Sequence, residues 1–338
     1  MKMVKLGRTG LCVPQLAFGA LPIQRTDKPE AVRILRAAYD GGIRFFDTAR
    51  AYSDSEEKIG AALSAVRNDI VIATKTTAVD AKTAAGHLET SLSNMKTDYI
   101  DIIQLHTPER MPDPGDENSA YAELVRAKKA GKVRFIGMTN HRAHVAREAV
   151  ESGLFDTLQF PMSHISSQSD LSLVDLCVSH NVGFIAMKAL CGGLVTNIPA
   201  AFTFFRRYDH VVPIWGIQHM HELEEFLELE RNPPVPDDAF LSAIDRDRRE
   251  LASSFCRGCG YCLPCPAGIP IPMSARMSFL LRRAPYAQFL TPEWKEMMGR
   301  IKSCVNCGSC KAKCPYNLDT PALLREMLSD YEEFARTH

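Results

Sequence analysis

The 338-residue sequence has no excess of either charge, because 40 Lys and Arg side chains balance 40 Asp and Glu side chains. We therefore expect no polyanionic partner such as nucleic acid. The sequence also lacks any apolar run close to the roughly 20 residues that a transmembrane helix needs, so we expect no membrane association. The first ten residues, MKMVKLGRTG, contain no apolar stretch of the kind found in secretory signals, which predicts a cytoplasmic protein.

Cysteine is scarce over most of the chain and concentrated near its end. Three of the eleven cysteines, Cys12, Cys177 and Cys191, lie apart from one another, and we expect small buried apolar side chains there. The remaining cysteines form two tight runs, between residues 256 and 265 and between 304 and 314. Because cytosolic thiols are kept reduced, these runs indicate metal binding rather than disulfides.

Short apolar segments alternate with amphipathic segments through residues 1–230. Several of the amphipathic segments begin at Asp or Ser and end at Gly, which is typical of helices. Strands are predicted over residues 15–18, 43–46, 70–73, 100–105, 133–136, 157–160, 182–187 and 211–215. Helices are predicted over residues 27–39, 56–66, 81–94, 120–130, 142–151, 170–179, 200–206 and 221–229.

Eight alternating units of this kind predict an α/β fold, a (β/α)8 TIM barrel with parallel strands. A doubly wound open sheet is the alternative, which is disfavoured because no G-x-G-x-x-G follows the first strand. Residues 3–14, with turn glycines at Gly7 and Gly10, predict a hairpin that closes the bottom of the barrel.

Ionisable side chains stand at the ends of three consecutive predicted strands. The second strand runs into Asp47, with Tyr52 five positions later, the third ends at Lys75, and the fourth at His106. The chemistry of a TIM barrel is located at the carboxyl ends of its strands, so these side chains are expected to share one site. Isolated caps or surface ion pairs are the alternative interpretation of each residue alone.

This Asp-Tyr-Lys-His set resembles the catalytic tetrad of the aldo-keto reductases, and LGRTGLCVPQLAFGA resembles their amino-terminal signature. The resemblance implies that Tyr52 is the general acid that protonates a carbonyl oxygen as nicotinamide delivers hydride. A free phenol, with a pKa of about 10, is a weak acid near neutrality. The resemblance therefore implies that Lys75 lowers the phenol pKa, that Asp47 pairs with Lys75, and that His106 orients the carbonyl.

The same resemblance implies nicotinamide contacts in the loops after strands five to eight. GMTN after strand five is similar to the G-x-S-N of the family, and WGIQHMHELEEF corresponds to its phosphate loop and following helix. Glycine, having no Cβ, allows a pyrophosphate to approach the backbone. The implied contacts are Thr139, Asn140 and Gln159 at the carboxamide, Lys188, Gly192 and Gly193 at the pyrophosphate, and Gly216, Gln218 and Glu225 near the adenosine.

Two positions depart from the family pattern. Gln218 stands where NADP-preferring members often carry Lys or Arg, and Phe226 stands where Asn usually follows the adenine-contacting Glu. The choice between NAD and NADP is therefore open. Trp215 and residues 21–24 are expected to line the substrate pocket, which suggests a small or partly apolar carbonyl or alcohol substrate.

A proline-rich segment, RNPPVPDD at residues 231–238, predicts a domain boundary, with the barrel over residues 1–232 and a second domain over 239–338. Helices are predicted over 239–253, 273–283, 292–302 and 321–335, the last with Thr320 as its cap and Pro321 in first position. The second domain is therefore expected to be mainly helical.

The two cysteine runs predict two [4Fe-4S] clusters in a ferredoxin-like domain. The second run has the C-x2-C-x2-C-x3-C-P spacing of bacterial ferredoxins, whose fourth cysteine ligates the other cluster. Ligation within each run is the alternative, because the first run has x2 before its last cysteine, and zinc is the rival metal. Crossed ligation assigns Cys256, Cys259, Cys262 and Cys314 to cluster one, and Cys304, Cys307, Cys310 and Cys265 to cluster two.

The chain as a whole resembles the ferredoxin-fused branch of the aldo-keto reductases. Three hypotheses follow: an oxidoreductase whose clusters exchange electrons with a ferredoxin-like partner, a nicotinamide-dependent carbonyl reductase with structural or oxygen-sensing clusters, and an electron-transfer subunit with a non-catalytic barrel. Nicotinamide transfers two electrons and each cluster one, a mismatch that a flavin normally bridges. We find no flavin fingerprint, although the barrel mouth has room for one.

Overall fold

A computed structural model describes residues 1–193, 195–251, 255–283 and 285–338. It divides the chain into two compact units, Met1–Ala243 and Ile244–His338. The division falls inside helix α9 (Asp238–Leu251), a few residues after the proline-rich segment at which the sequence predicts the domain boundary. In the described parts of the chain, every helix is too short or too polar to span the apolar core of a bilayer.

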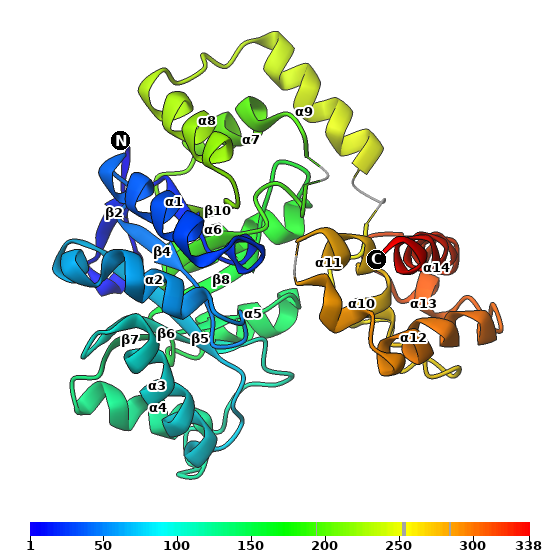
Figure 1. Cartoon of the computed structure of the whole chain (residues 1–338), viewed down its shortest axis with the longest axis horizontal. Coiled ribbons are helices and arrows are strands. Elements are labelled where there is room, and N and C mark those ends of the chain that lie inside the picture. The colour runs from blue at the N-terminus through cyan, green and yellow to red at the C-terminus, as the bar shows by residue number, and fades with distance from the viewer. Residues whose placement is uncertain (194, 252–254, 284) are drawn as a thin grey trace. The chain divides into compact units, whose positions relative to one another are not determined.

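The first unit is a closed barrel of eight parallel strands, as the sequence predicts (Figure 1). The chain-order neighbours pair throughout, and the last strand closes against the first. This closure brings all eight carboxyl ends to one mouth. The strands are β3 (Ala17–Gly19), β4 (Phe45–Asp47), β5 (Val71–Thr76), β6 (Ile100–His106), β7 (Val133–Thr139), β8 (Thr157–Pro161), β9 (Gly183–Met187) and β10 (Val211–Gly216).

A helix follows each strand and packs an apolar face against the barrel. Several begin at the predicted caps: the side chains of Asp27, Asp80 and Ser119 each accept a hydrogen bond from a backbone N–H in the first turn. The helices are α1 (Lys28–Asp40), α2 (Ser55–Leu63), α3 (Ala81–Met95), α4 (Ala120–Lys129), α5 (Ala143–Glu151), α6 (Gln168–Ser179), α7 (Ile198–Arg206) and α8 (Met220–Arg231).

The amino-terminal hairpin closes the bottom of the barrel. Strands β1 (Met3–Lys5) and β2 (Cys12–Pro14) pair antiparallel. Their buried Val4 and Val13 pack in one cluster with Phe45 and other residues of the barrel strands. Cys12, predicted to be buried, is exposed, because it lies on the outer face of this edge hairpin, whereas Cys177 and Cys191 are buried as predicted.

The second unit is helical, and its core surrounds the cysteine loops. Its elements after α9 include α10 (Ile271–Ser274), α11 (Met277–Arg283), α12 (Pro292–Gly299), α13 (Ser309–Ala312) and α14 (Thr320–Thr337). Buried Met277, Leu281, Leu324 and Tyr331 form part of one apolar cluster. Several cysteines of the two runs also pack against this apolar core, so the cysteine loops and the helices share one core.

Three of the predicted boundaries are wrong or only partly tested. The helix predicted over residues 273–283 breaks at Ala275, whose N–H bonds both Ile271 O and Met273 O and thereby ends α10. Asp319, not Thr320, caps the final helix, because its carboxylate accepts the Ala322 N–H. The predicted helix 239–253 is observed as α9 up to Leu251, and residues 252–253 lie outside the described residues.

Candidate active site and cluster cavities

A buried ion pair links the ends of strands β4 and β5. The Lys75 ammonium donates to both carboxylate oxygens of Asp47, at 2.8 and 2.7 Å, and to the carbonyl oxygen of Thr48 at 2.6 Å. Both side chains are about 1% exposed. Burial shifts the pKa of Asp47 upward and that of Lys75 downward, while the attraction between the two charges opposes both shifts. Each charge is therefore neutralised by the other inside the barrel.

Tyr52 and His106 lie beside this pair at the mouth of the barrel. The Lys75 Nζ is 5.2 Å from the centre of the Tyr52 ring, and the Tyr52 and His106 rings are 6.0 Å apart in an edge-to-face arrangement. The structure thus brings together all four residues that the sequence places at consecutive strand ends. Their catalytic roles remain a prediction at this point.

The electrostatics of Tyr52 differ from the expectation. Burial and the negative charge of Asp47 raise the pKa of the Tyr52 phenol, whereas the family resemblance implies that Lys75 lowers it. The largest cause of the raised pKa is burial of the phenol, and the Lys75 ammonium donates to both oxygens of Asp47. Tyr52 is therefore a neutral phenol at physiological pH.

His106 is neutral as well. Burial, and to a smaller extent the charge of Lys75, lowers its pKa to about 3. Its Nδ1 atom is buried and has no hydrogen-bond partner among the described residues. Buried polar atoms are normally paired, so this nitrogen marks a position that a bound polar molecule would satisfy.

Thr139, Asn140 and Gln159, the predicted contacts of the carboxamide, lie on or just after the two strands that follow His106. Each already forms a hydrogen bond with another residue of the chain. The Gln159 side chain accepts from Gln104 at 2.8 Å and also bonds the Asp47 carboxylate. Asn140 donates to Pro108 O at 2.9 Å, and Thr139 accepts from the Thr107 N–H at 3.1 Å. Gln159 thus supports the ion pair, a connection for which the sequence carries no signal.

The loop after β9 adopts a left-handed backbone. Lys188 has φ +59°, and Gly192 and Gly193 have φ +75° and +95°. Glycine adopts such angles without steric cost, so the loop is preset in this shape. Leu194 follows and lies outside the described residues.

The loop after β10 carries an acidic cap. The Glu222 carboxylate accepts the backbone N–H groups of Gln218 and His219, at 2.7 and 3.0 Å. Gly216 ends β10 and Glu225 is exposed on α8, so both lie near this loop in the chain. Sequence reasoning missed Glu222, although a Glu three residues after a cap position is a recognisable capping signal.

Trp215 does not line the mouth, contrary to the expectation. Its side chain is buried with its ring centre 4.6 Å from that of Phe226 and 5.5 Å from that of Phe205. Successive strand residues face opposite sides of a sheet, and Trp215 faces the helices outside the barrel. Phe226 likewise belongs to this core. Of the segment 21–24, Leu21 is exposed, whereas Pro22 and Ile23 are buried.

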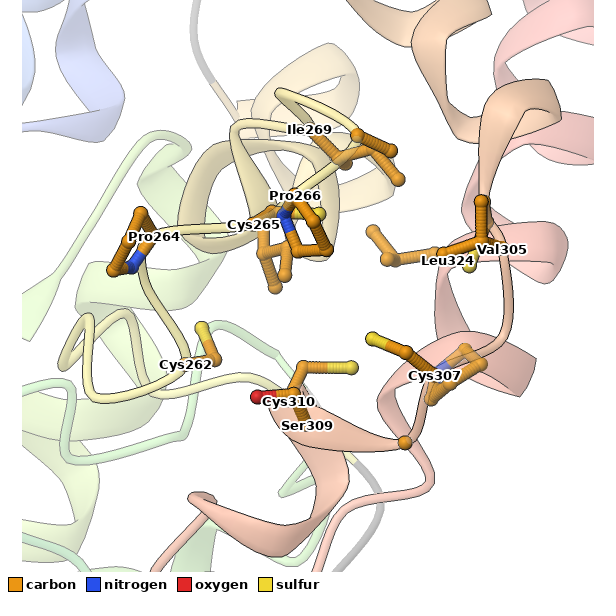
Figure 2. A pocket seen from close by; sticks show the side chains of 15 residues that line it. Cys262, Pro264, Cys265, Pro266, Ile269, Val305, Cys307, Ser309, Cys310 and Leu324 are labelled. Atoms are coloured by element: carbon orange, nitrogen blue, oxygen red, sulfur yellow. The ribbon is translucent and has the colours of Figure 1, made fainter.

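The eight clustered cysteines line two cavities in the second unit. The first cavity is lined by Cys256, Cys259, Cys262 and Cys314. The second is lined by Cys265, Cys304, Cys307 and Cys310, and also by Cys262. Figure 2 shows Cys262 and Cys265 approaching the second cavity from one loop, and Cys307 and Cys310 from the other. Apart from Cys262, which lines both cavities, the two groups correspond to the crossed sets, and the ligation itself stays a prediction.

The cysteines that line these cavities are thiolate donors, which [4Fe-4S] clusters and zinc both accept. Among the described residues, no three Cys, His, Asp or Glu side chains converge closely enough to ligate a single metal ion. Burial raises the pKa of Cys262 to about 12, and the neighbouring Cys256 and Cys259 add to the rise. Several thiolates in one cavity therefore need compensating positive charge, which the irons of a cluster provide.

Comparisons with known proteins agree with both halves of this picture. Residues 15–237 match the aldo/keto reductase family, and residues 255–319 match a 4Fe-4S dicluster domain. Aldo-keto reductase YhdN of Bacillus subtilis is 28% identical over 217 residues, covering 58% of this chain and 64% of that protein. L-galactose dehydrogenase of Arabidopsis thaliana is 30% identical over 211 residues, covering 57% of this chain and 66% of that protein.

The chain thus spans slightly less than two-thirds of the length of these two relatives. An aldo/keto reductase from Klebsiella pneumoniae, solved in complex with NADP and acetate, superposes with a TM-score of 0.61 at 20% identity. The superposition covers 72% of this chain and 94% of that one, which shows a common fold. The family resemblance and the barrel predicted from the sequence are therefore confirmed.

The neutral state of His106 predicts a specific acid sensitivity. An unfolded His titrates near 6.5, whereas folded His106 titrates near 3, so between these values the unfolded chain binds the extra proton. The free energy of unfolding should therefore fall with falling pH, by at most about 1.4 kcal/mol per pH unit from this group. Thermal unfolding of the protein and of His106→Asn, measured from pH 7 to 4.5, should show the shallower decline in the variant. Parallel curves would contradict the assignment.

Crossed ligation predicts which two cysteine substitutions remove the signal of the same cluster. Cys314→Ser should remove the same cluster signal as Cys256→Ser, and Cys265→Ser the same signal as Cys304→Ser, in electron paramagnetic resonance spectra of anaerobically loaded, reduced protein. Cys177→Ser is the matched control, because that thiol is buried in the barrel, and it should lose no iron. If Cys314→Ser instead removed the signal lost in Cys304→Ser, ligation would be local to each run.

Proposed function

Because the chain belongs to the aldo/keto reductase family and carries a 4Fe-4S dicluster domain, we propose that it is an oxidoreductase of a carbonyl or alcohol substrate. We infer that it uses a nicotinamide cofactor in the barrel and two [4Fe-4S] clusters for electron transfer to or from a ferredoxin-like partner. The observation that carries the proposal is the position of Tyr52 at the barrel mouth, with its ring centre 5.2 Å from Lys75 Nζ and 6.0 Å from the centre of the His106 ring.

In this proposal the protein groups hold and deliver one proton. Tyr52 is a neutral phenol and donates its proton to the carbonyl oxygen, which becomes strongly basic as the carbonyl is reduced. His106, being neutral, offers a ring nitrogen that hydrogen-bonds the same oxygen without competing as an acid. Lys75 and Asp47 join the ends of β4 and β5, beside Tyr52 and the end of β6 that carries His106. A bound nicotinamide would supply the hydride with both of its electrons. Two one-electron transfers through the clusters, together with one proton from solvent, would then return the oxidised nicotinamide to its reduced form.

The nicotinamide contacts are proposed at the residues that match the family pattern. The remaining amide hydrogens of Asn140 and Gln159 face the carboxamide in this proposal, and Thr139 adds a hydroxyl. Gly192 and Gly193 present backbone close to the pyrophosphate, with Lys188 supplying positive charge. Gly216, Gln218 and Glu225 lie toward the adenosine half.

The ligands of cluster one are proposed to be Cys256, Cys259, Cys262 and Cys314, and those of cluster two Cys265, Cys304, Cys307 and Cys310. Support comes from the two cavities that these sets line. Cys307 is the exposed member of the second set. We propose that electrons exchange with the partner protein at this edge, because electron transfer between proteins needs a short path to solvent-facing ligands.

Substitution of the proposed acid tests whether the barrel is catalytic. Tyr52→Phe removes the hydroxyl and should lower kcat for carbonyl reduction by about 10²–10⁴-fold, the usual contribution of a general acid. Tyr39→Phe is the matched control, because its hydroxyl bonds Asp69 on the outer surface, and it should leave kcat unchanged. Steady-state turnover with a panel of small carbonyl compounds measures both. Equal turnover in Tyr52→Phe and the parent would leave the barrel without a catalytic role.

Substitution of a cluster ligand separates electron transfer from a structural role. Cys307→Ser should abolish turnover driven by a reduced ferredoxin-like donor while leaving the barrel folded. If the clusters only stabilise or sense oxygen, the variant should retain full turnover with NAD(P)H and show no donor-dependent activity in either form. The measurement is anaerobic turnover with each electron source, alongside the iron content of both proteins.

The acidic cap after β10 predicts the nicotinamide type. Glu222 occupies two backbone N–H groups near Gln218, and residues 216–226 contain no Lys or Arg. A 2′-phosphate placed there would meet a carboxylate instead of a cation, so NADH should bind more tightly than NADPH. Fluorescence titration measures the dissociation constants of NADH and NADPH. In Glu222→Gln the difference between these two constants should be smaller. Tighter binding of NADPH to the parent protein would contradict this reading.

A further inference from the structure

Arg276 lies against the loop that carries the first two cysteines. A Cβ atom added at Gly258 would lie 2.8 Å from the Cζ and 2.9 Å from an Nη atom of Arg276. The guanidinium therefore packs directly on the backbone between Cys256 and Cys259. Gly258 has φ +74° and is the residue that allows this approach.

The guanidinium has only neutral partners. Its Nε donates to Pro272 O at 2.7 Å, and an Nη contacts the Met273 sulfur at 3.4 Å. No ion pair with Asp or Glu is found for it among the residues that the structure describes. Burial lowers the pKa of Arg276, and the neighbouring Cys256 and Cys259 oppose this shift. An arginine keeps its charge at any physiological pH, so the Arg276 cation lies beside the cysteine loop without a carboxylate partner among the described residues.

The two cysteine cavities differ in this respect. Arg257 lines the first cavity, is 7% exposed and has its guanidinium 4.2 Å from the Tyr316 ring centre. Arg257 in the cavity wall and Arg276 on Gly258 therefore both lie beside the cysteines that would ligate cluster one. The second cavity is lined by apolar, Cys, Gly and Ser residues, with no charged side chain in its wall. The two clusters would thus lie in different electrostatic environments.

We propose that Arg276 is a positioning residue that raises the reduction potential of cluster one and so makes the two clusters unequal. Reduction of a cluster adds one electron and one negative charge and forms or breaks no bond. A fixed cation close to the ligating thiolates stabilises the reduced state more than the oxidised state, because the reduced state carries the larger negative charge. The inference rests on the crossed ligation proposed above, since it needs Cys256 and Cys259 as ligands of one cluster.

Redox titration of the full, anaerobically loaded chain tests this directly. In Arg276→Gln, one of the two cluster midpoints should fall, so that the reduced-to-oxidised ratio at a fixed potential decreases about tenfold, equivalent to roughly 59 mV for a one-electron couple. The other midpoint should not move, and Arg276→Lys should recover most of the shift. Electron paramagnetic resonance at each poised potential, with mediators, measures both clusters.

Arg282→Gln is the matched control. It also removes one arginine, yet Arg282 is paired with Asp330 at the surface, at 2.7 Å, so neither midpoint should change. Unchanged midpoints in Arg276→Gln, or equal shifts of both clusters, would overturn the proposal. If Arg276→Gln failed to retain iron, Arg276→Lys decides: iron retained with Lys shows that the charge holds the anionic cluster, and iron lost from both shows that only packing matters.

This test is independent of catalysis by the barrel. A protein that holds two clusters but reduces no carbonyl compound would still show the Arg276 shift. Conversely, a chain that takes up no iron under strict exclusion of air would refute the ligation proposal itself. The two failures are therefore distinguished by iron content, measured on the same samples.

Discussion

The buried ion pair of Asp47 and Lys75 is the interaction on which the barrel site depends. Two charges are withdrawn from water there, a cost that only close pairing and further hydrogen bonds offset. Gln159 and the Thr48 carbonyl supply those additional bonds. Because the partners come from adjacent strands, the pair forms only when β4 and β5 are in register. Burial beside this pair keeps Tyr52 and His106 neutral, with Asp47 adding to the rise of the Tyr52 pKa and Lys75 to the fall of the His106 pKa. Tyr52 can then act as a proton donor and His106 as a hydrogen-bonding group.

The second unit has a constraint of its own. The cysteines that line one cavity come from two segments about fifty residues apart in the chain, so these segments have to lie side by side. Cys314 joins the loop of Cys256 to Cys262, and Cys265 joins the loop of Cys304 to Cys310. Ligation of this kind ties the two loops together through both cavities. In the proposed ligation, metal binding would contribute to folding as well as to redox chemistry.

Much of the fold and of the candidate site was predictable from the sequence. The limit is that the sequence does not show burial or contacts between side chains. The period of apolar residues predicts eight strands, and strand ends of a closed parallel barrel converge, so Asp47, Lys75 and His106 could be placed together. The cysteine spacing predicts the crossed sets in the same way. The raised pKa of Tyr52 was not predictable, because it depends on how deeply the phenol is buried and on its distance from the Asp47 carboxylate. The packing of Arg276 on Gly258 was not predictable either, because the two residues are separated in the sequence and no motif relates them.

The most direct test of the central claim is a pH titration of Tyr52 itself. With 13C-labelled tyrosine, the nuclear magnetic resonance signals of the nine tyrosines can be followed, and Tyr52→Phe identifies the one that belongs to Tyr52. The account predicts that this signal does not titrate below about pH 10, the ordinary value for a tyrosine, because burial and Asp47 hold the phenol neutral. A midpoint near or below neutrality would contradict it and would mean that Lys75 acts on the phenol despite its pairing with Asp47.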